Sequence, residues 1–286
     1  MQIIKKKINS IVNLLLPRGY FFDLFYHYLR FYFVNKRIPR KKKFLLNDFL
    51  FYTKINLKIT KGKYHICSDK IELKKYLEKK INKENILETI SIISNNEGIS
   101  NFNFKKNQII KPAHMSGAII FTNKIKNIND IKNKMKDWLN IDYYSIYREN
   151  NYKNLKKRIM IEHDLTYNSE VSDLKVFCYK GNIKFFQIDT ARFTHHKRQF
   201  LDNNWNIIDV KWQYESLNKK FPKPKFFNKI LKSCIIISKD FDFVRIDFLI
   251  TKNNFYCNEL TFVPGKAEDR FISIKEETKL SKYLFL

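Results

Sequence analysis

Two carboxylates on neighbouring strand-like segments are the clearest candidates for chemistry in this sequence. The stretch FVRIDFLITKNNFYCNELTFVPG, residues 243–265, has two apolar runs joined by TKNN, with Asp247 in the first run and Glu259 in the second. Side chains alternate between the two faces of a strand, so Arg245 shares a face with Asp247. A loop of odd length, such as residues 252–254, places Asp247 directly opposite Glu259, whereas an even loop places them on different faces.

Facing carboxylates destabilise a bare hairpin, and the residues allow two ways of removing that cost. In the first, Mg²⁺ lies between Asp247 and Glu259, because this ion binds oxygen, commonly one or two carboxylates together with substrate phosphates. Arg245 then holds one acid in place or contacts a phosphate. In the second, Arg245, Asp247 and Glu259 form a salt-bridge cluster without a metal. The spacing alone does not decide between them.

A second group of candidates is the cationic stretch ARFTHHKRQF, residues 191–200, which contains Arg192, His196, Lys197 and Arg198. Adjacent histidines do not readily chelate one ion, and the nearby cations would repel a metal. We therefore interpret the stretch as an anion site for a γ-phosphate, an acyl phosphate or an acidic glycan. The alternative is a solvated basic turn.

Helices and antiparallel strands must position these residues, and we expect an α+β fold rather than a doubly wound parallel one. Apolar periodicity predicts helices over 69–92, 128–142 and 226–240, the first with an N-cap at Ser68-Asp69. Strand patterns occupy 108–124 on both sides of a loop, 157–166, and the hairpins 173–193 and 243–265.

Composition bounds the class of protein. The 286 residues are 44% hydrophobic, enough for one large domain or two small ones, and the net charge is +27. Such a charge favours polyanionic partners, but abundant Lys, Ile, Asn, Phe and Tyr are also typical of an AT-rich genome, so part of the excess has no functional meaning. Four well-separated cysteines indicate neither a zinc site nor a disulfide framework, which fits a reducing cytoplasm.

The N-terminal segment, residues 1–43, is rich in cations and aromatic rings and ends in the cluster Arg40–Lys43. It has no apolar run long enough for a transmembrane helix, and Pro17-Arg18 interrupts it without a small-residue cleavage site, so we do not interpret it as a signal peptide. It either lies on an acidic membrane surface or packs on the body of the protein.

Several motifs together resemble a known family. RIDF followed by NELTFVPG resembles the end of an ATP-grasp domain, where a strand Asp and a later Glu bind Mg-ATP. The closer likeness is to the TupA-like branch, which is associated with teichuronopeptide and other bacterial surface polysaccharides. Further segments resemble that branch in the same order: SDK at 68–70, KPAHMSG at 111–117, RIMIEHDL at 158–165 and the stretch 173–205. The likeness spans roughly residues 65–270, so we divide the chain into an N-terminal segment, 1–60, and a TupA-like domain, 61–286.

The resemblance implies an ATP-grasp fold, in which two α+β lobes with antiparallel sheets clamp ATP. Its roles carry over onto matching positions as follows: ATP binding by Lys70, Lys111, Ser116, Gly117, Glu162, Leu165 and Lys175; catalysis by Arg192 and Arg245; substrate binding by His196, Lys197 and Arg198; and Mg²⁺ binding by Asp247 and Glu259. One departure is Thr261, which stands where other ATP-grasp domains often have a metal-binding Asn.

The same resemblance implies an ATP-dependent carboxylate–amine ligase that forms an amide through an acyl phosphate, with ATP and Mg²⁺ as cofactors and glycan-linked substrates. We expect a cytoplasmic protein, with peripheral contact to the inner face of the bacterial membrane as an open alternative, and no nucleic-acid partner. Two other functions stay open: an ATP-grasp kinase acting on a sugar or glycan, and a non-enzymatic basic module that binds membrane or nucleic acid.

Overall fold

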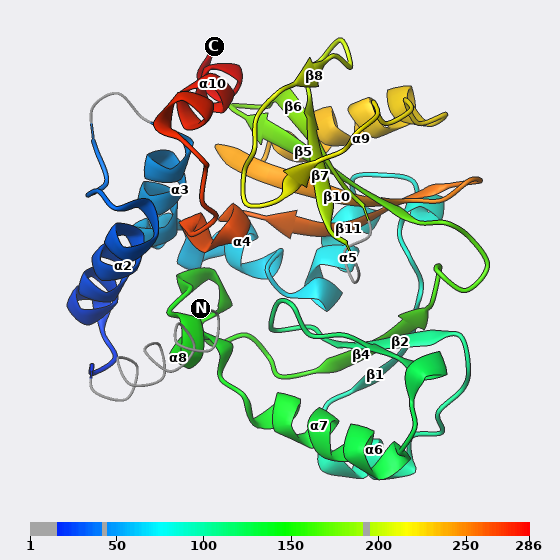
Figure 1. Ribbon diagram of the computed structural model, residues 1–286. Coiled ribbons are helices and arrows are strands. Elements are labelled where there is room, and N and C mark those ends of the chain that lie inside the picture. Colours follow the sequence, from blue (N-terminus) through cyan, green and yellow to red (C-terminus); the bar gives the residue numbers. More distant parts are fainter. Residues whose placement is uncertain (1–15, 42–44, 191–194) are drawn as a thin grey trace.

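Two antiparallel sheets form the two lobes of the molecule (Figure 1). The structure is a computed structural model and describes residues 16–41, 45–190 and 195–286. In these ranges the strands of the smaller sheet, sheet A, are β1 (Thr89–Ile93), β2 (Gln108–Pro112), β3 (Ile120–Phe121) and β4 (Ile159–His163). Those of sheet B are β5 (Ser172–Tyr179), β6 (Asn182–Thr190), β7 (Lys197–Leu201), β8 (Ile207–Ile208), β9 (Glu215–Ser216), β10 (Phe243–Ile250) and β11 (Phe255–Thr261).

Helices cover the sheets and join them. The described α-helices are α2 (Tyr20–Asn35), α3 (Leu46–Ile55), α4 (Gly62–Ile66), α5 (Lys70–Glu78), α6 (Asn96–Asn101), α7 (Ile128–Asn140), α8 (Tyr143–Tyr147), α9 (Phe227–Ser238) and α10 (Ile274–Phe285). Short 3₁₀ turns are η1 (Leu57–Thr60), η2 (Lys83–Asn85), η3 (Thr122–Lys124), η4 (Asn150–Tyr152) and η5 (Pro264–Ala267). None of the helices in the described part of the chain is long and apolar enough to cross a membrane.

Sheet A has the strand order β1-β4-β2-β3, and sheet B has the order β11-β10-β5-β6-β7-β8, with β9 paired to β7. All neighbours are antiparallel except β7 and β9. The hairpin β10-β11, which carries Asp247 and Glu259, is therefore the edge of sheet B, next to the hairpin β5-β6. The predicted α+β class with antiparallel sheets is confirmed.

Most predicted elements are present, but the helix expected over 69–92 is too long. It begins where predicted, because the Asp69 carboxylate caps it by accepting hydrogen bonds from the Ile71 and Glu72 amides. It ends at Glu78, and residues 89–93 form strand β1 instead. The sequence there, TISII, is rich in β-branched residues, whose stiff side chains favour strands over helices.

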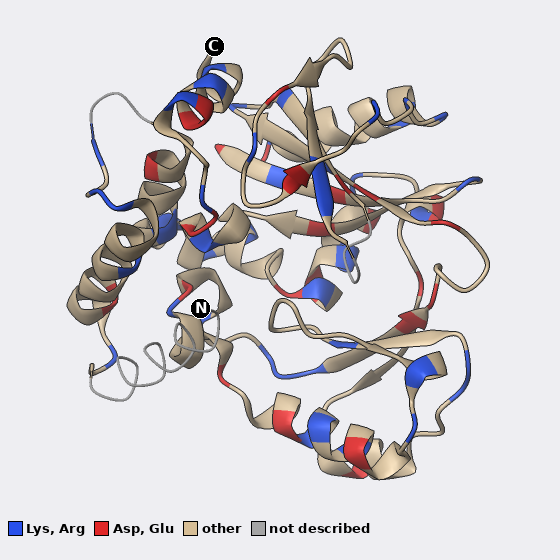
Figure 2. Ribbon diagram, viewed as in Figure 1, with Lys and Arg blue, Asp and Glu red and all other residues tan. Residues whose placement is uncertain are grey.

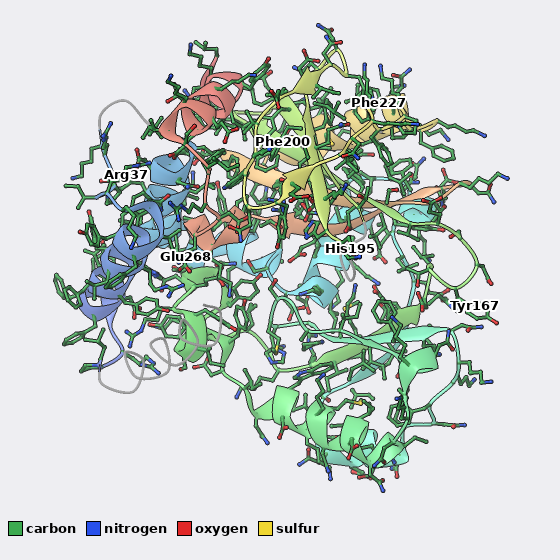
Figure 3. All side chains as sticks on the ribbon, viewed as in Figure 1. Arg37, Tyr167, His195, Phe200, Phe227 and Glu268 are labelled. Carbon is green, nitrogen blue, oxygen red and sulfur yellow. The ribbon has the colours of Figure 1, made fainter. Side chains whose placement is uncertain are left out.

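Each sheet has its own apolar core, and α5 contacts both. Figure 3 labels Phe200 and Phe227, two buried rings of the core of sheet B, which α3, α9 and α10 cover. The core of sheet A includes Met135 and Trp138 of α7. Helix α5 contributes Leu73 to the core of sheet B. On its other side it meets sheet A through Ile71, which packs on Ala113 and Met160.

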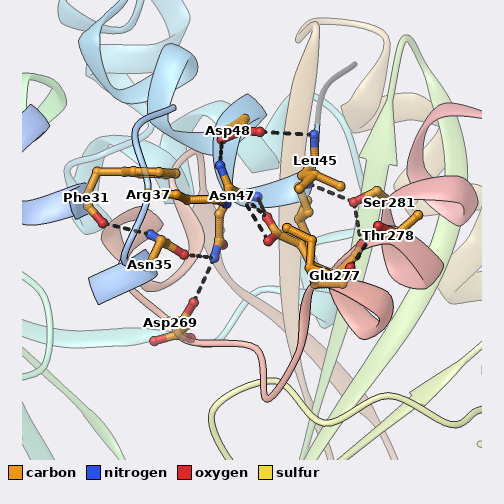
Figure 4. A network of polar contacts seen from close by, with 12 residues as sticks. Phe31, Asn35, Arg37, Leu45, Asn47, Asp48, Asp269, Glu277, Thr278 and Ser281 are labelled. Atoms are coloured by element: carbon orange, nitrogen blue, oxygen red, sulfur yellow. Dashed lines mark hydrogen bonds and ion pairs between the residues drawn. The ribbon is translucent and has the colours of Figure 1, made fainter. Parts of the chain in front are cut away.

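The N-terminal helices are tied to the C-terminal helix by buried polar contacts, shown in Figure 4. Glu277 of α10 accepts two bonds of 3.1 Å from the Arg37 guanidinium and one of 3.0 Å from the Asn47 amide. Arg37 also pairs with Asp48. Residues 46–51 share the core of sheet B. The division of the chain into an N-terminal segment, residues 1–60, and a TupA-like domain, residues 61–286, remains a proposal.

We predict that Glu277→Ala lowers the free energy of unfolding by about 3 kcal/mol, because the half-buried Arg37 guanidinium and the buried Asn47 amide both lose a charged partner. Chemical denaturation measures the change. Lys275→Ala, on an exposed position of the same helix, is the control and should alter stability by less than about 0.5 kcal/mol. Equal stability of the two variants would show that this network does not hold α10 in place.

Candidate functional site

The hairpin β10-β11 holds Asp247 and Glu259 as a directly opposed pair. Of the two loop lengths considered from the sequence, the structure has the even one: Ile250 pairs with Phe255, which leaves an even number of residues between the strands. A β-bulge at Asn258 adds one residue to β11, so Asp247 pairs with Glu259 while Phe248 pairs with Cys257. The bulge therefore restores the facing arrangement that an even loop alone would abolish.

Arg245 forms a bidentate salt bridge with both carboxylate oxygens of Asp247. Its Nε and Nη2 donate over 2.7 and 2.6 Å, and Nη2 also donates to the Thr261 hydroxyl over 3.1 Å. Burial raises the pKa of Asp247, and the charges of Arg245 and Lys175 oppose that rise. Half-buried Glu259 stands apart, since no hydrogen bond or ion pair joins its carboxylate to another described residue. Only two of the three residues thus form the salt bridge considered above.

Lys175 lies beside this pair, because it pairs with Asp247 across β5 and β10. Its ammonium is 3.9 Å from Asp173 on the same strand, but 3.1 Å from Asp189 on β6. Burial would raise the pKa of Asp189, yet Lys175, His196 and Arg198 together hold it far below its usual range. Our sequence reasoning missed Asp189, although its place on the hairpin partner of β5 is a usable signal.

The structure places the described residues of the predicted anion site on two different sides of strand β7. Arg198 is buried, and its guanidinium donates to Asp189 over 2.8 and 3.3 Å. His196 Nε2 lies 3.3 Å from the same carboxylate, while its ring stacks on Tyr214. Lys197 alternates to the other side of β7 and donates to Asn218. Arg192 lies outside the described residues, so an anion site built from these four residues stays a prediction.

In sheet A, Lys111 of β2 and Glu162 of β4 form an ion pair of 2.5 Å. Glu162 also pairs with Lys74 of α5. Burial would raise the pKa of Glu162, but the charges of Lys111 and Lys74 lower it below its usual value. Lys111 reaches across to sheet B, where its ammonium donates to the Asn258 side chain over 3.2 Å. Lys111 therefore joins the lobes at the bulge of the hairpin β10-β11.

Lys70 and the loop after β2 are packed together. The Lys70 ammonium donates to the Met115 carbonyl over 2.6 Å, and burial lowers its pKa. Ser116 hydrogen-bonds with the buried Tyr152 phenol. Gly117 is exposed and has a φ of 77°, a conformation that favours glycine. Leu165 follows β4 in a turn, where its carbonyl accepts a bond from Ser169.

A cavity of 170 Å³ is lined by part of the predicted site, including Ser116, Asp247 and Glu259. Acidic and basic residues both occur on the elements around the space between the two sheets (Figure 2). The lining residues include Ser116, Glu149, Asn151, Tyr152, Asp173, Arg245, Asp247, Asn258, Glu259, Thr261, Gly265 and Lys266. A larger cavity of 510 Å³ lies elsewhere, around Lys211, Tyr214 and Arg270, and contains none of the predicted site residues.

Glu149 and Lys266, which sequence reasoning also missed, form the far wall of the 170 Å³ cavity, with 3.6 Å between Oε1 and Nζ. Burial raises the pKa of Glu149 and lowers that of Lys266. Gly265, Lys266 and Ala267 all have φ between 57° and 59°. A side chain at Gly265 would clash with Asp269 at 2.4 Å. The left-handed backbone costs about 1–2 kcal/mol for each non-glycine residue, so strain accumulates at the point where Lys266 enters the cavity.

The two carboxylates of Asp247 and Glu259 are too few to hold a cation such as Mg²⁺ by themselves, and phosphate oxygens would have to supply further ligands. No group of three or more His, Cys, Asp or Glu that could hold a metal occurs among the described residues. Asp247 and Glu259 provide two carboxylates, and each Asp247 oxygen retains a lone pair beyond its bond to Arg245. This matches the usual pattern of Mg²⁺ on a phosphate substrate.

Comparisons with known proteins give a family and a set of similar structures. A family model described as TupA-like ATPgrasp matches residues 51–284. Similar solved structures include the D-alanine–D-alanine ligase of Helicobacter pylori, at 17% identity and a TM-score of 0.41, which aligns 77% of this chain with 61% of that one. The D-alanine–D-alanine ligase of Bacillus anthracis complexed with ATP has 12% identity and a TM-score of 0.45, and 77% of this chain aligns with 65% of that one. The L-amino acid ligase of Bacillus licheniformis has 9% identity and a TM-score of 0.44, and 76% of this chain aligns with 49% of that one. No curated protein matches the chain. The chain thus spans less than two thirds of the length of the first of these structures.

We predict that Asp189→Asn destabilises the fold by about 3 kcal/mol at neutral pH, because Lys175 and Arg198 lose their shared buried charge. The folded-state pKa of Asp189 lies below the unfolded value of about 3.9. Its contribution to stability is therefore complete above that pH and is lost as the pH falls toward the folded-state pKa. Denaturation curves should show wild type and variant converging below about pH 3.9.

Asp209→Asn, at an exposed position, is the matched control and should leave stability unchanged both at neutral pH and below about pH 3.9. A difference between wild type and Asp189→Asn that stays constant down to the acid limit would contradict the assigned pKa direction.

Proposed function

The chain belongs to the TupA-like ATP-grasp family, and on that premise we propose that it is an ATP-dependent carboxylate–amine ligase. The observation that carries the proposal is the opposed pair Asp247 and Glu259 at a cavity between two lobes, with Lys111 reaching it from sheet A and Lys175 from sheet B. This arrangement brings carboxylates for a divalent ion and ammonium groups for phosphates to one place.

Mg²⁺ would be held by Glu259 and Asp247. Glu259 suits this role because its carboxylate has no hydrogen bond or ion pair to a described residue, and Asp247 suits it because Arg245 fixes its orientation. When bound, the ion neutralises negative charge on the phosphates. Thr261 donates no carboxylate or amide oxygen, and its hydroxyl already accepts a bond from Arg245, so we propose one ion rather than two.

ATP would enter between the lobes, with Lys111, Lys70 and Lys175 near the phosphates. A site for a drug-sized ligand has a volume of about 300–1,000 Å³. The observed cavity, at 170 Å³, holds less than a nucleotide. Binding of ATP therefore requires the lobes to separate and the Lys111–Asn258 hydrogen bond between them to break. The Glu162–Lys111 pair lies within sheet A and can move as one body with it.

The reaction would proceed in two steps. A substrate carboxylate oxygen attacks the γ-phosphorus of ATP, the bond to the β,γ-bridging oxygen breaks, and ADP leaves. Arg245 and Lys175 offset the charge that develops on the transferred group. An amine nitrogen then attacks the acyl carbon, the carbon–oxygen bond to phosphate breaks, and the amine gives up a proton as the amide forms. Closed lobes keep water from hydrolysing the acyl phosphate.

We propose glycan-linked carboxylate and amine substrates of bacterial surface polysaccharide synthesis in the cytoplasm, in keeping with the family resemblance. Among the described residues, Lys266 at the far wall of the cavity has the charge to receive a substrate carboxylate. His196, Lys197 and Arg198 remain the proposed substrate contacts, although Arg198 also pairs with Asp189, and Arg192 remains a proposed catalytic cation.

We predict that Asp247→Asn and Glu259→Gln each reduce ATP turnover by roughly 10²-fold or more, because the charge that balances the phosphates is lost. ADP release and product mass are measured with Mg²⁺, ATP and panels of uronic acids, amino acids and amines. The exposed Asp209→Asn is the matched control. Undiminished turnover in Asp247→Asn contradicts the assignment of the site.

Hydroxylamine distinguishes a ligase from a kinase on the same fold. An acyl phosphate is captured as a hydroxamate, whereas a phosphorylated hydroxyl is not. Hydroxamate formation that depends on the carboxylate substrate supports the ligase. Phosphorylated sugar without hydroxamate identifies a kinase, and the absence of any Mg²⁺-dependent thermal stabilisation by ATP identifies a non-enzymatic module.

A further inference from the structure

Helix α2 exposes a row of aromatic side chains to solvent, which we call the aromatic face. The most exposed ring is that of Phe21, at 79%, and the helix carries further rings between 42% and 58% exposed. The aromatic face consists of Phe21, Phe22, Phe25, Tyr32 and Phe33. Soluble proteins seldom leave so many large apolar groups together in water, so such patches mark surfaces for binding.

The exposed rings gather on one side because of helical periodicity. At 100° per residue, Phe21, Phe25 and Tyr32 lie within 40° of one another, and Phe22 and Phe33 follow on one side, so that all five fall within about 120°. The opposite side of the helix packs on the protein and contains Asp23, Tyr26, His27, Phe31 and Val34. Helix α2 therefore has two apolar sides, and within the described part of the chain only one of them is packed.

The charges around the aromatic face are positive. Lys36, Arg40 and Lys41 follow the helix and are all exposed, and the Lys36 ammonium lies 6.0 Å from the ring of Phe33. The single acid of α2, Asp23, is buried, where it accepts bonds from Arg148 and from the hydroxyl of Tyr144. The helix thus presents rings and cations to solvent without a carboxylate.

Buried contacts fix the direction in which the face points. His27 Nε2 lies 2.9 Å from the Arg148 carbonyl, and Arg30 pairs with Glu268, which Figure 3 labels beside α2. Figure 1 shows α2 at the edge of the molecule, away from both sheets. The rings are therefore held outward on a rigid support.

We propose that the aromatic face of α2 docks on an acidic lipid bilayer, with the helix lying in the plane of the interface. Aromatic rings favour the boundary between head groups and acyl chains, and exposed Lys and Arg beside them attract anionic head groups. A second copy of this chain fits less well. A two-fold contact would bring the cations of both copies together on a protein whose net charge is +27.

The test is co-sedimentation of the full chain with phosphatidylcholine vesicles, with and without phosphatidylglycerol. Wild type should bind the acidic vesicles and not the neutral ones. Replacing three rings, in F21Q/F25Q/F33Q, should weaken binding at least about tenfold, because most of the inserted area is lost. The control I235Q/I236Q removes two residues that are 44% and 43% exposed on α9, and it should bind as wild type does. K36E/R40E/K41E should lose the preference for acidic vesicles.

Circular dichroism and thermal stabilisation by Mg-ATP, measured on each variant, separate loss of docking from loss of the fold or of the nucleotide site. Failure of wild type to bind acidic vesicles overturns the proposal, as does undiminished binding by F21Q/F25Q/F33Q. A wild-type dimer in light scattering that the same substitutions convert to a monomer assigns the face to a second copy and also overturns it.

Discussion

The geometry of the site depends on one backbone irregularity, the bulge at Asn258. Without it, the even connection between β10 and β11 would place Asp247 and Glu259 on opposite faces of sheet B, and no ion could contact both. The extra residue, Asn258, also contacts the other lobe, because its side chain accepts a hydrogen bond from Lys111. The same bulge thus pairs the acids and supplies a contact that closes the lobes over them.

Buried acids in this protein are surrounded by more than one cation. Glu162 lies between Lys74 and Lys111, and Asp189 contacts both Lys175 and Arg198. Burying such clusters costs desolvation energy, so they contribute less to stability than to a defined arrangement of charge. The lining of the cavity itself contains four acids, Glu149, Asp173, Asp247 and Glu259, and two cations, Arg245 and Lys266. Phosphates, the ligand chemistry that the family membership leads one to expect, would therefore need a divalent cation beside these carboxylates.

Local patterns in the sequence predicted much of the fold. Strand alternation placed Asp247 and Arg245 on one face, and the Asp69 cap located the start of α5. The ordered motifs indicated the TupA-like ATP-grasp family, which the family match confirms. The limits were set by non-local effects. Pairing with β4 makes a strand of residues 89–93, and no pattern of residue types shows that β11 carries a bulge.

The site residues that we missed are of two kinds. Asp189 was within reach, because hairpin pairing puts β6 beside Lys175 and a buried ammonium needs a partner. Glu149 and Lys266 were not. They are 117 positions apart in the chain, and only the fold brings them to one wall of the cavity.

Buried ionic contacts connect the surface of α2 with that wall. Arg30 of α2 pairs with Glu268, and Lys54 donates both to Glu268 over 3.3 Å and to the Lys266 carbonyl over 3.0 Å. Lys266 in turn pairs with Glu149 on the same wall of the cavity. Because closely packed groups with buried charge resist relative movement, the orientation of α2 and the orientation of the cavity wall are set together. A bilayer that holds α2 would therefore also hold the cavity at a fixed height and angle above the lipid. A substrate anchored in that membrane would then reach the cavity from one direction, whereas a freely diffusing substrate would gain nothing from the arrangement.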